Sequence, residues 1–140
     1  MSDYGRRANV DAYVETEILQ ADPVRLVCLL YRGAVDASAK ARQHLRAGQI
    51  RERSRQITRA SEIINELAIS INTEQGGQIG RNLVELYDYM QGLLQQANFR
   101  QSDAPLLELE KLLSTLLTAW EQCQPAADSA PVSHPRLVTA

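Results

Sequence analysis

The chain has 140 residues, enough for one domain with a buried core and too few for two large domains. Aromatic residues make up only 5% of it, and its apolar residues are mainly leucine, isoleucine and alanine, which favours helices and argues against a β-sheet fold. Its formal net charge of -2 argues against a protein that attracts nucleic acid or an anionic membrane through a long-range field.

The first 20 residues predict a short amphipathic arm. Asn9 can cap a helix whose apolar positions include Tyr13, Val14 and Ile18. The same residues hold four acidic side chains and no long apolar run, which argues against a signal peptide and a membrane span. We therefore expect a cytoplasmic protein in which residues 1–20 form an arm outside the main fold.

Asp22 and Pro23 mark the start of the first long helix, because aspartate caps a helix end and proline suits the first helical position. Gly48 is placed to end this helix, so we predict that it spans residues 23–47. We expect one apolar stripe of this helix to face the core. That stripe comprises Leu26, Leu30, Gly33, Ala37, Ala41 and Leu45.

Three more helices are predicted from apolar stripes with spacings of three and four residues. One should end near Asn72 and has Ile50 a heptad ahead of its stripe, the next runs from about Ile79 to Ala97 after a glycine break, and the last covers 103–123. The three stripes are Ile57, Ala60, Ile64, Leu67 and Ile71; then Ile79, Leu83, Leu86, Met90, Leu93 and Ala97; then Leu106, Leu109, Leu113, Leu116 and Trp120.

The short connections between these helices favour antiparallel neighbours. We predict an all-α fold, an antiparallel up-down four-helix bundle over residues 21–123 with a short extra N-terminal helix. Residues 124–140 contain three prolines among small residues and show no periodicity, so we predict a disordered tail there.

The reactive side chains argue against an enzyme. His44 and His134 fall in segments that should not meet, and the sequence lacks the glutamate–histidine pairs with which ferritin-like bundles bind metals. Cys28 and Cys123 are not arranged as a CxxC pair and are interpreted as buried or idle thiols. We predict no catalytic residue, no metal and no cofactor.

Arg51, Arg55 and Arg59 lie four residues apart on one predicted helix face and are the best argument for a nucleic-acid surface. The acidic balance of the chain and the lack of interleaved aromatic residues argue against it. We favour a solvated face partnered by nearby glutamates and expect no nucleic acid as partner. A small nucleic-acid-binding helical protein is kept as an alternative.

The helix over 23–47 has a second apolar stripe opposite the first one. Because a four-helix bundle covers only one face of each helix, something else must cover this stripe. The helix that begins near Ile79 has a smaller flank of the same kind. We predict that both surfaces bind a partner, and that the arm competes for them or covers them permanently through Tyr13, Val14 and Ile18. The predicted binding residues are Val24, Val27, Cys28, Tyr31, Val35, Val84, Tyr87 and Leu94.

A series of segments, in order and at similar spacing, resembles the flagellar secretion chaperones of the FliS family. The resemblance covers about residues 10–122. It consists of Tyr13, Asp22-Pro23, Leu29-Leu30-Tyr31-Arg32-Gly33-Ala34, Ile63-Ile64-Asn65-Glu66-Leu67, Glu74-Gln75-Gly76-Gly77, Asn82-Leu83-Val84-Glu85-Leu86-Tyr87-Asp88-Tyr89-Met90 and Ala119-Trp120.

The resemblance implies a cytosolic export chaperone. Such a protein binds the C-terminal segment of unassembled flagellin, prevents premature polymerisation and delivers the subunit to the flagellar export gate for type III secretion. It inserts into no membrane, and a homodimer is left open. The alternative is a generic helical adaptor that binds an amphipathic helix of another protein.

The resemblance also implies roles for individual residues. Tyr13 would belong to the arm, and Leu86 with Tyr87 would form a motif on the helix that begins near Ile79. The groove on the first long helix would be formed by Leu29, Leu30 and Tyr31. The chain departs from the family at Arg32, where an acidic residue is common.

Overall fold

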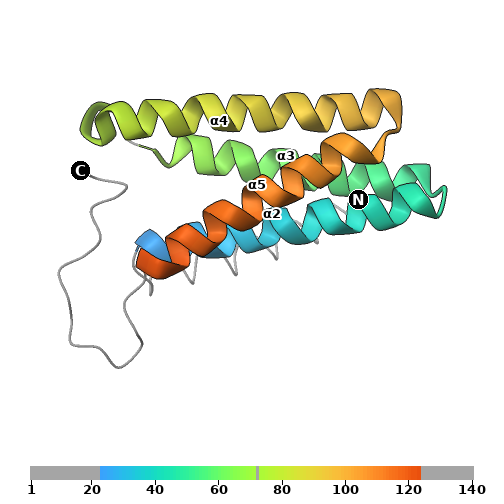
Figure 1. Cartoon of the computed structure of the whole chain (residues 1–140), viewed down its shortest axis with the longest axis horizontal. Helices are drawn as coiled ribbons and strands as arrows, with labels where there is room; N and C mark the ends of the chain where they lie inside the picture. The colour runs from blue at the N-terminus through green and yellow to red at the C-terminus, as the bar shows by residue number, and fades with distance from the viewer. Residues whose placement is uncertain (1–22, 72, 124–140) are drawn as a thin grey trace, which may run out of the picture.

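The computed structural model describes residues 23–71 and 73–123, which form four helices around one hydrophobic core (Figure 1). These helices are α2 at Pro23–Arg46, α3 at Ile50–Ile69, α4 at Thr73–Arg100 and α5 at Asp103–Cys123. The described residues contain no strand. The all-α class with four helices is thus confirmed, while the predicted arm and tail lie outside the described residues.

The predicted helix ends hold best where a glycine sets them. Gly48 adopts a positive φ of 72° just after α2, a conformation that glycine reaches without steric cost. The predicted glycine break is also present, as a kink near the start of α4 where Gly77 leaves the helical conformation with φ 59° and ψ -138°. Helix α3 ends at Ile69 and not at Asn72, and the Ser70 hydroxyl donates to the Leu67 carbonyl at 2.7 Å.

The size of the side chains at each interface decides how closely the helices approach. Helix α2 packs against α3 and α5, and α4 packs less closely against the same two helices. At the α2–α3 contact Gly33 comes so near that an added Cβ atom would lie 3.2 Å from Cδ1 of Ile63. Small buried residues of α2 allow this approach, whereas the large core residues of α4 hold the backbones apart. The two sets are Ala34, Ala37, Ser38 and Ala41 on α2 and Tyr87, Met90, Leu93 and Leu94 on α4.

The core face of α2 is only partly the one predicted. Ala37 and Ala41 of the predicted stripe are buried, but Leu26 and Leu30 are only half-buried, and the stripe interpreted as a surplus face enters the core. Both stripes are apolar, so periodicity could not choose between them, and contacts with both α3 and α5 decide the orientation. The buried residues of α2 are Val24, Val27, Cys28, Tyr31, Ala34, Ala37, Ser38 and Ala41.

The stripes of the other three helices are mostly confirmed. The core includes Ile57, Ala60, Ile64, Leu67, Met90, Leu93, Ala97, Leu106, Leu109, Leu113 and Trp120. Two residues were assigned wrongly, because Ile50 is 57% exposed and Ile79 is 62% exposed. Ile50 stands at the first position of α3, and Ile79 is exposed although the next residue, Gly80, is buried.

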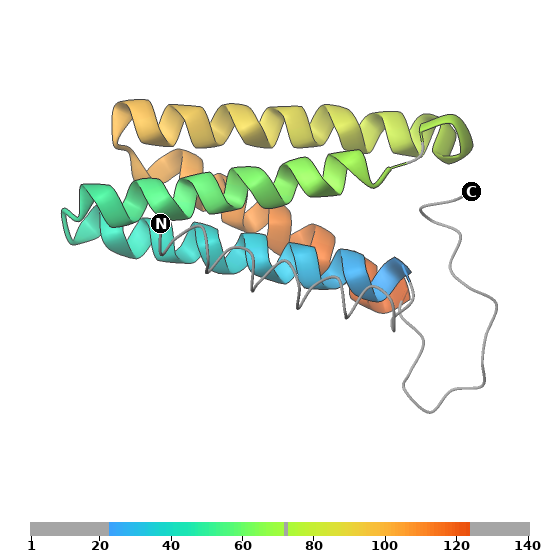
Figure 2. The same ribbon diagram turned by 180° about the vertical axis from the view of Figure 1, so that it is seen from behind.

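Two views show that α2 begins and α5 ends at the same end of the molecule as the α3–α4 connection (Figures 1 and 2). We call this the connection end. The neighbouring pairs are α2–α3, α3–α4, α4–α5 and α5–α2. In the described part of the chain the diagonal pairs, α2 with α4 and α3 with α5, keep their backbones apart.

Candidate functional site

A small, shallow hollow opens at the connection end. All four helices contribute to its wall, which is mainly apolar. The residues that line it are Val27, Leu67, Ser70, Ile71, Gly76, Gly80, Leu83, Tyr87 and Trp120. No side chain in this wall carries a formal charge, so the hollow suits an apolar group of another segment and offers nothing that would hold an ion.

Behind the wall, Tyr31 of α2 meets Tyr87 of α4 across the diagonal of the bundle. Their hydroxyl oxygens are 2.6 Å apart, and the ring centroids are 6.5 Å apart with the planes tilted by 48°. Tyr31 is fully buried and Tyr87 is 2% exposed. Because an unpaired buried hydroxyl is costly, this hydrogen bond ties together two helices whose backbones do not touch.

The electrostatics of the tyrosine pair follow from its burial. Burial raises the pKa of Tyr31, while hydrogen bonds to Tyr87 and Trp120 oppose that rise. Burial is also the main cause that raises the pKa of Tyr87, and the neighbouring Tyr31 adds to it. Both phenols therefore stay neutral near pH 7 and act here as hydrogen-bonding core residues.

The predicted binding residues lie mainly inside the protein. Val35 and Val84 are half-buried, and the other six are buried among the core side chains: Val24, Val27, Cys28, Tyr31, Tyr87 and Leu94. Of the eight, Val27 and Tyr87 also line the hollow. Contact of any of these residues with a partner stays a prediction, and the three arm residues, Tyr13, Val14 and Ile18, lie outside the described residues.

Sequence reasoning missed the residues that build the hollow around Val27 and Tyr87. Trp120, Leu67 and Leu83 had been assigned to core stripes, which says nothing about an opening. The one available signal was the position of Trp120, which is the single tryptophan of the chain and lies near the end of the last stripe. Which residues of the other helices stand beside it depends on the packing of all four.

An ion pair lies on the outside of the same helices. Arg32 of α2 donates to Glu121 of α5 at 2.9 Å, and both side chains are well exposed. Arg32, where the family commonly has an acidic residue, therefore has an acidic partner within the chain. An exposed pair of this kind adds little to stability.

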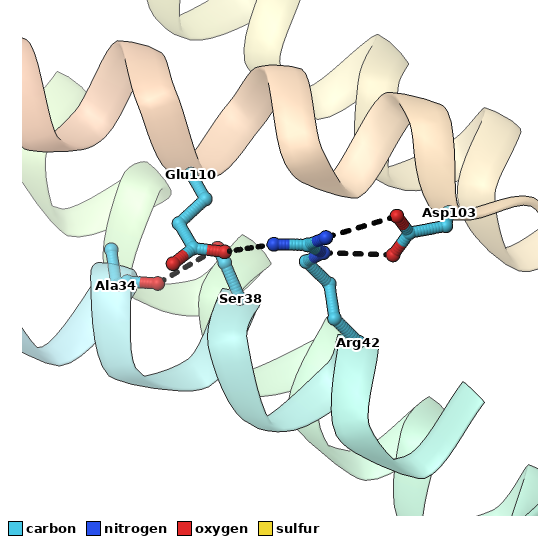
Figure 3. Close-up of polar contacts among 5 residues, drawn as sticks. All are labelled: Ala34, Ser38, Arg42, Asp103 and Glu110. Carbon is cyan, nitrogen blue, oxygen red and sulfur yellow. Dashed lines mark hydrogen bonds and ion pairs between the residues drawn. The ribbon is translucent and has the colours of Figure 1, made fainter. Parts of the chain in front are cut away.

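A stronger polar cluster joins α2 to the start of α5 at the other end of the bundle (Figure 3). Arg42 donates to both carboxylate oxygens of Asp103, at 2.8 and 3.1 Å, and to Glu110 at 3.1 Å. The hydrogen bonds from Arg42 lower the pKa of Asp103, and those to Asp103 and Glu110 raise the pKa of Arg42. This bidentate geometry fixes the position of α5 relative to α2.

The arginine stripe of α3 is partly engaged by acidic and polar groups. Arg59 donates to Asp36 at 2.9 Å and to Gln56 at 3.4 Å, and the bond from Arg59 is the main cause that lowers the pKa of Asp36. Lys40 also pairs with Asp36 at 3.1 Å. These contacts support a solvated, charge-paired face.

Two other kinds of feature are absent from the described residues. Within 23–71 and 73–123, no group of three or more histidine, cysteine, aspartate or glutamate side chains could hold a metal ion. In the same ranges no helix has the length and apolar character needed to cross a membrane. Within the described residues, Cys28 and Cys123 form no disulfide, and Cys28 is buried.

Comparison with known proteins identifies the family. Residues 6–127 match the family described as flagellar protein FliS. The chain belongs to this family. The flagellar secretion chaperone FliS of Salmonella typhimurium is 38% identical to it over 124 residues, which cover 88% of this chain and 92% of that protein.

Two further FliS relatives agree. The flagellar secretion chaperone FliSB of Pseudomonas aeruginosa is 33% identical over 108 residues, covering 77% of this chain and 86% of its own. The FliS of Vibrio cholerae is 28% identical over 123 residues, covering 85% and 90%. These matches confirm the family predicted from the sequence and the role of flagellar secretion chaperone that went with it.

Proposed function

We propose that this chain is a cytoplasmic export chaperone that holds the C-terminal segment of unassembled flagellin and delivers it to the flagellar export gate. The FliS family match carries the proposal. The apolar, uncharged hollow to which all four helices contribute supports it, because such a surface suits apolar side chains of a partner segment.

The proposed mechanism needs no bond chemistry, no catalytic residue and no cofactor. Binding the client lowers the concentration of free flagellin that can polymerise, by mass action alone. A client that folds onto the chaperone spends part of the interaction energy on ordering itself, which keeps the complex reversible and suits a subunit that must later be released.

The proposed binding surface begins at the hollow. Val27 and Tyr87 face a client there, and the half-buried Val35 and Val84 extend the surface along α2 and α4. The fully buried Tyr31 supports Tyr87 from behind through the 2.6 Å hydrogen bond. Client contact with the buried Val24, Cys28 and Leu94 would require the bundle to open; we assign these three to the core of the free protein.

The proposed topology is an antiparallel up-down bundle over 21–123, with an N-terminal arm over 1–20 that carries a short helix and a tail over 124–140. The order of the contacts between helices supports the antiparallel part. Along α2 and α5, Arg42 pairs with Asp103, and Arg32, nearer the start of α2, pairs with Glu121 near the end of α5. Short links between successive helices favour the same arrangement.

Calorimetric titration of the full chain with a peptide of the flagellin C-terminal segment tests the proposal. We expect saturable binding with a negative heat-capacity change and little loss of affinity between low and high salt, since apolar burial dominates. Absence of binding, together with binding of an unrelated amphipathic helix, would support a generic adaptor instead. Binding of RNA or DNA that falls steeply with added salt would support the nucleic-acid alternative.

A further inference from the structure

The buried face of α3 begins with a charged residue. Arg53 lies on this face and is only 4% exposed. The face continues through Ile57, Ala60, Ile64 and Leu67. A buried charge without a partner is costly, so buried arginines usually have a carboxylate or several carbonyl groups around the guanidinium. The burial of Arg53 therefore calls for a counter-charge.

No counter-charge for Arg53 is present among the described residues. Its Nε atom is fully buried and has no hydrogen-bond partner. The terminal nitrogens of the guanidinium also make no hydrogen bond or ion pair within 23–71 and 73–123, but they are not fully enclosed and so are open to an approaching group. A long side chain on a helix lies over the turn that precedes its own Cα atom. The guanidinium of Arg53 is thus directed toward the first turn of α3.

The first turn of α3 offers a second set of unused donors. Gln49 occupies the N-cap position, but its side chain makes no capping hydrogen bond, and its Oε1 lies 2.7 Å from Nδ1 of His44. The Gln49 carbonyl accepts the backbone N–H of Arg53 at 3.0 Å. The N–H groups of residues 50–52 precede that bond and have no acceptor within the helix. Such a helix start attracts an anion, and the Arg53 guanidinium adds a full positive charge beside it.

The surroundings of this turn are also positive. The end of the bundle opposite the connection end, which we call the far end, holds the α2–α3 and α4–α5 connections (Figures 1 and 2). Its other arginines are Arg42, Arg46, Arg51, Arg55 and Arg100. Arg42 is engaged by acidic residues of α5, whereas the side chains of Arg51 and Arg100 take part in no hydrogen bond or ion pair within the described residues. The far end therefore favours a negatively charged partner.

Two exposed apolar side chains beside the turn favour a protein segment over a phosphate backbone. Ile50 is 57% exposed and lies one turn before Arg53. Phe99 is 88% exposed and follows Asn98, whose Oδ1 accepts a hydrogen bond from Ser54 at 3.4 Å. The end of α4 thus lies beside the first turns of α3. A segment that carries both carboxylates and apolar side chains matches this combination, whereas a nucleic-acid backbone would leave Ile50 uncovered.

We propose that the far end holds an anion-binding site formed by the Arg53 guanidinium and the first turn of α3. Its ligand is a glutamate or aspartate side chain of an acidic, partly apolar segment of a partner protein. The bound carboxylate supplies the missing counter-charge. Leu67, which lines the hollow, lies fourteen residues further along α3, roughly 20 Å away. The site is therefore separate from the proposed client surface and does not rest on the proposed function.

Replacing Arg53 should have opposite effects on binding and on stability. Arg53→Met removes the charge-assisted hydrogen bonds and should weaken binding of an acidic segment by roughly 10- to 100-fold. The same change removes a buried charge that has no partner in the free protein, so the urea midpoint of unfolding should rise. An arginine that served only the fold would show the reverse, with a lower midpoint and unchanged binding.

A ten-residue peptide of alternating glutamate and leucine, titrated into the full chain, tests the site by NMR. We expect the backbone amides of residues 50–53 and the Arg53 Nε–H to shift, while the amides of Leu67 and Gly80 at the connection end stay unchanged. The same peptide with glutamine in place of each glutamate should cause no shift. Arg53→Met should lose the response. Arg81→Gln is the matched control and should keep it, because Arg81 is an exposed arginine of α4 outside the far end.

Four outcomes would overturn the proposal. Arg53→Met could bind the glutamate peptide as tightly as the wild type, or it could lower the urea midpoint. Inorganic phosphate or a single-stranded DNA could shift the amides of residues 50–53 while the peptide does not, which would make the ligand a phosphate. The same amides could shift without peptide as protein concentration rises, which would make the occupant a second copy of this chain.

Discussion

Tyr31→Phe removes one hydroxyl from the hydrogen bond that joins α2 to α4 across the core. The buried Tyr87 hydroxyl, 2.6 Å away, then loses its partner. An unsatisfied buried polar group costs about 1–3 kcal/mol, so this variant should lower the free energy of unfolding by about that amount. Tyr87→Phe leaves the buried Tyr31 hydroxyl without its partner in the same way and should have a similar cost.

The double variant tests this reasoning most directly. With both hydroxyls removed, neither is stranded, so we expect the double variant to be more stable than the sum of the single effects predicts, by about 1–2 kcal/mol. Urea unfolding followed by far-UV circular dichroism measures all four free energies. Tyr89→Phe is the matched control, because Tyr89 is an exposed tyrosine of the same helix and should change stability little. Effects that add to within about 0.5 kcal/mol would refute the coupling.

The same pair predicts a loss of stability in alkali. Burial raises the pKa of both phenols above the ordinary value of 10.0. A raised native pKa means that the contribution of the neutral pair is fully present below about pH 10 and is lost as pH rises through the native values. The free energy of unfolding of the wild type should therefore fall above about pH 10 more steeply than that of the double phenylalanine variant, and equal slopes would contradict this.

Three other features lead to predictions. Gly92→Ala should raise the free energy of unfolding by about 0.5–1 kcal/mol, because the added Cβ meets nothing within 4 Å. Gly33→Ala should raise it less, because the side chain of Ile63 must move aside. Gly77→Ala should lower it, because Gly77 has a φ of 59°. Thermal or urea unfolding orders the three, and any other order contradicts this account. Arg42 lowers the pKa of Asp103 below 3.8, so this contribution is present above about pH 4 and lost as pH falls below it. Asp103→Asn should reduce the loss of unfolding free energy below about pH 4 by less than about 1 kcal/mol, because the carboxylate is 38% exposed. An unchanged loss of stability in acid would contradict this prediction. Because α4 packs less closely than α2, its backbone amides should exchange with deuterium faster, and equal protection would contradict this.

Periodicity predicted some helices better than others, for a physical reason. In α3 and α5 the apolar residues form one dominant stripe, so the only face that could enter the core was visible in the sequence. In α2 both Leu26 and Tyr31 belong to apolar stripes, and a one-dimensional pattern contains no information about which neighbours a helix will have. The prediction placed the stripe of Leu26 in the core, whereas the structure buries Tyr31 and most of its stripe, together with only the alanines of the predicted one.

The candidate site could be predicted only in part. Val27 and Tyr87 were identified because they fall off the expected stripes, and both line the hollow. Their neighbours there, such as Trp120 and Leu67, come from helices far apart in sequence and looked like ordinary core residues. The hydrogen bond between Tyr31 and Tyr87 spans 56 positions and a diagonal of the bundle, and no local pattern signals it.

The sequence by itself determined the helical class, most of the core stripes of α3, α4 and α5, the glycine at the end of α2 and, through a series of short segments, the FliS family. These properties depend on residue type and local spacing, which the chain carries without reference to its fold. Tertiary structure alone decided which face of α2 is buried, how far α4 stands from its neighbours, and where four helix ends leave a hollow. Those depend on the sizes of side chains brought together from distant positions, which only packing in three dimensions can compare.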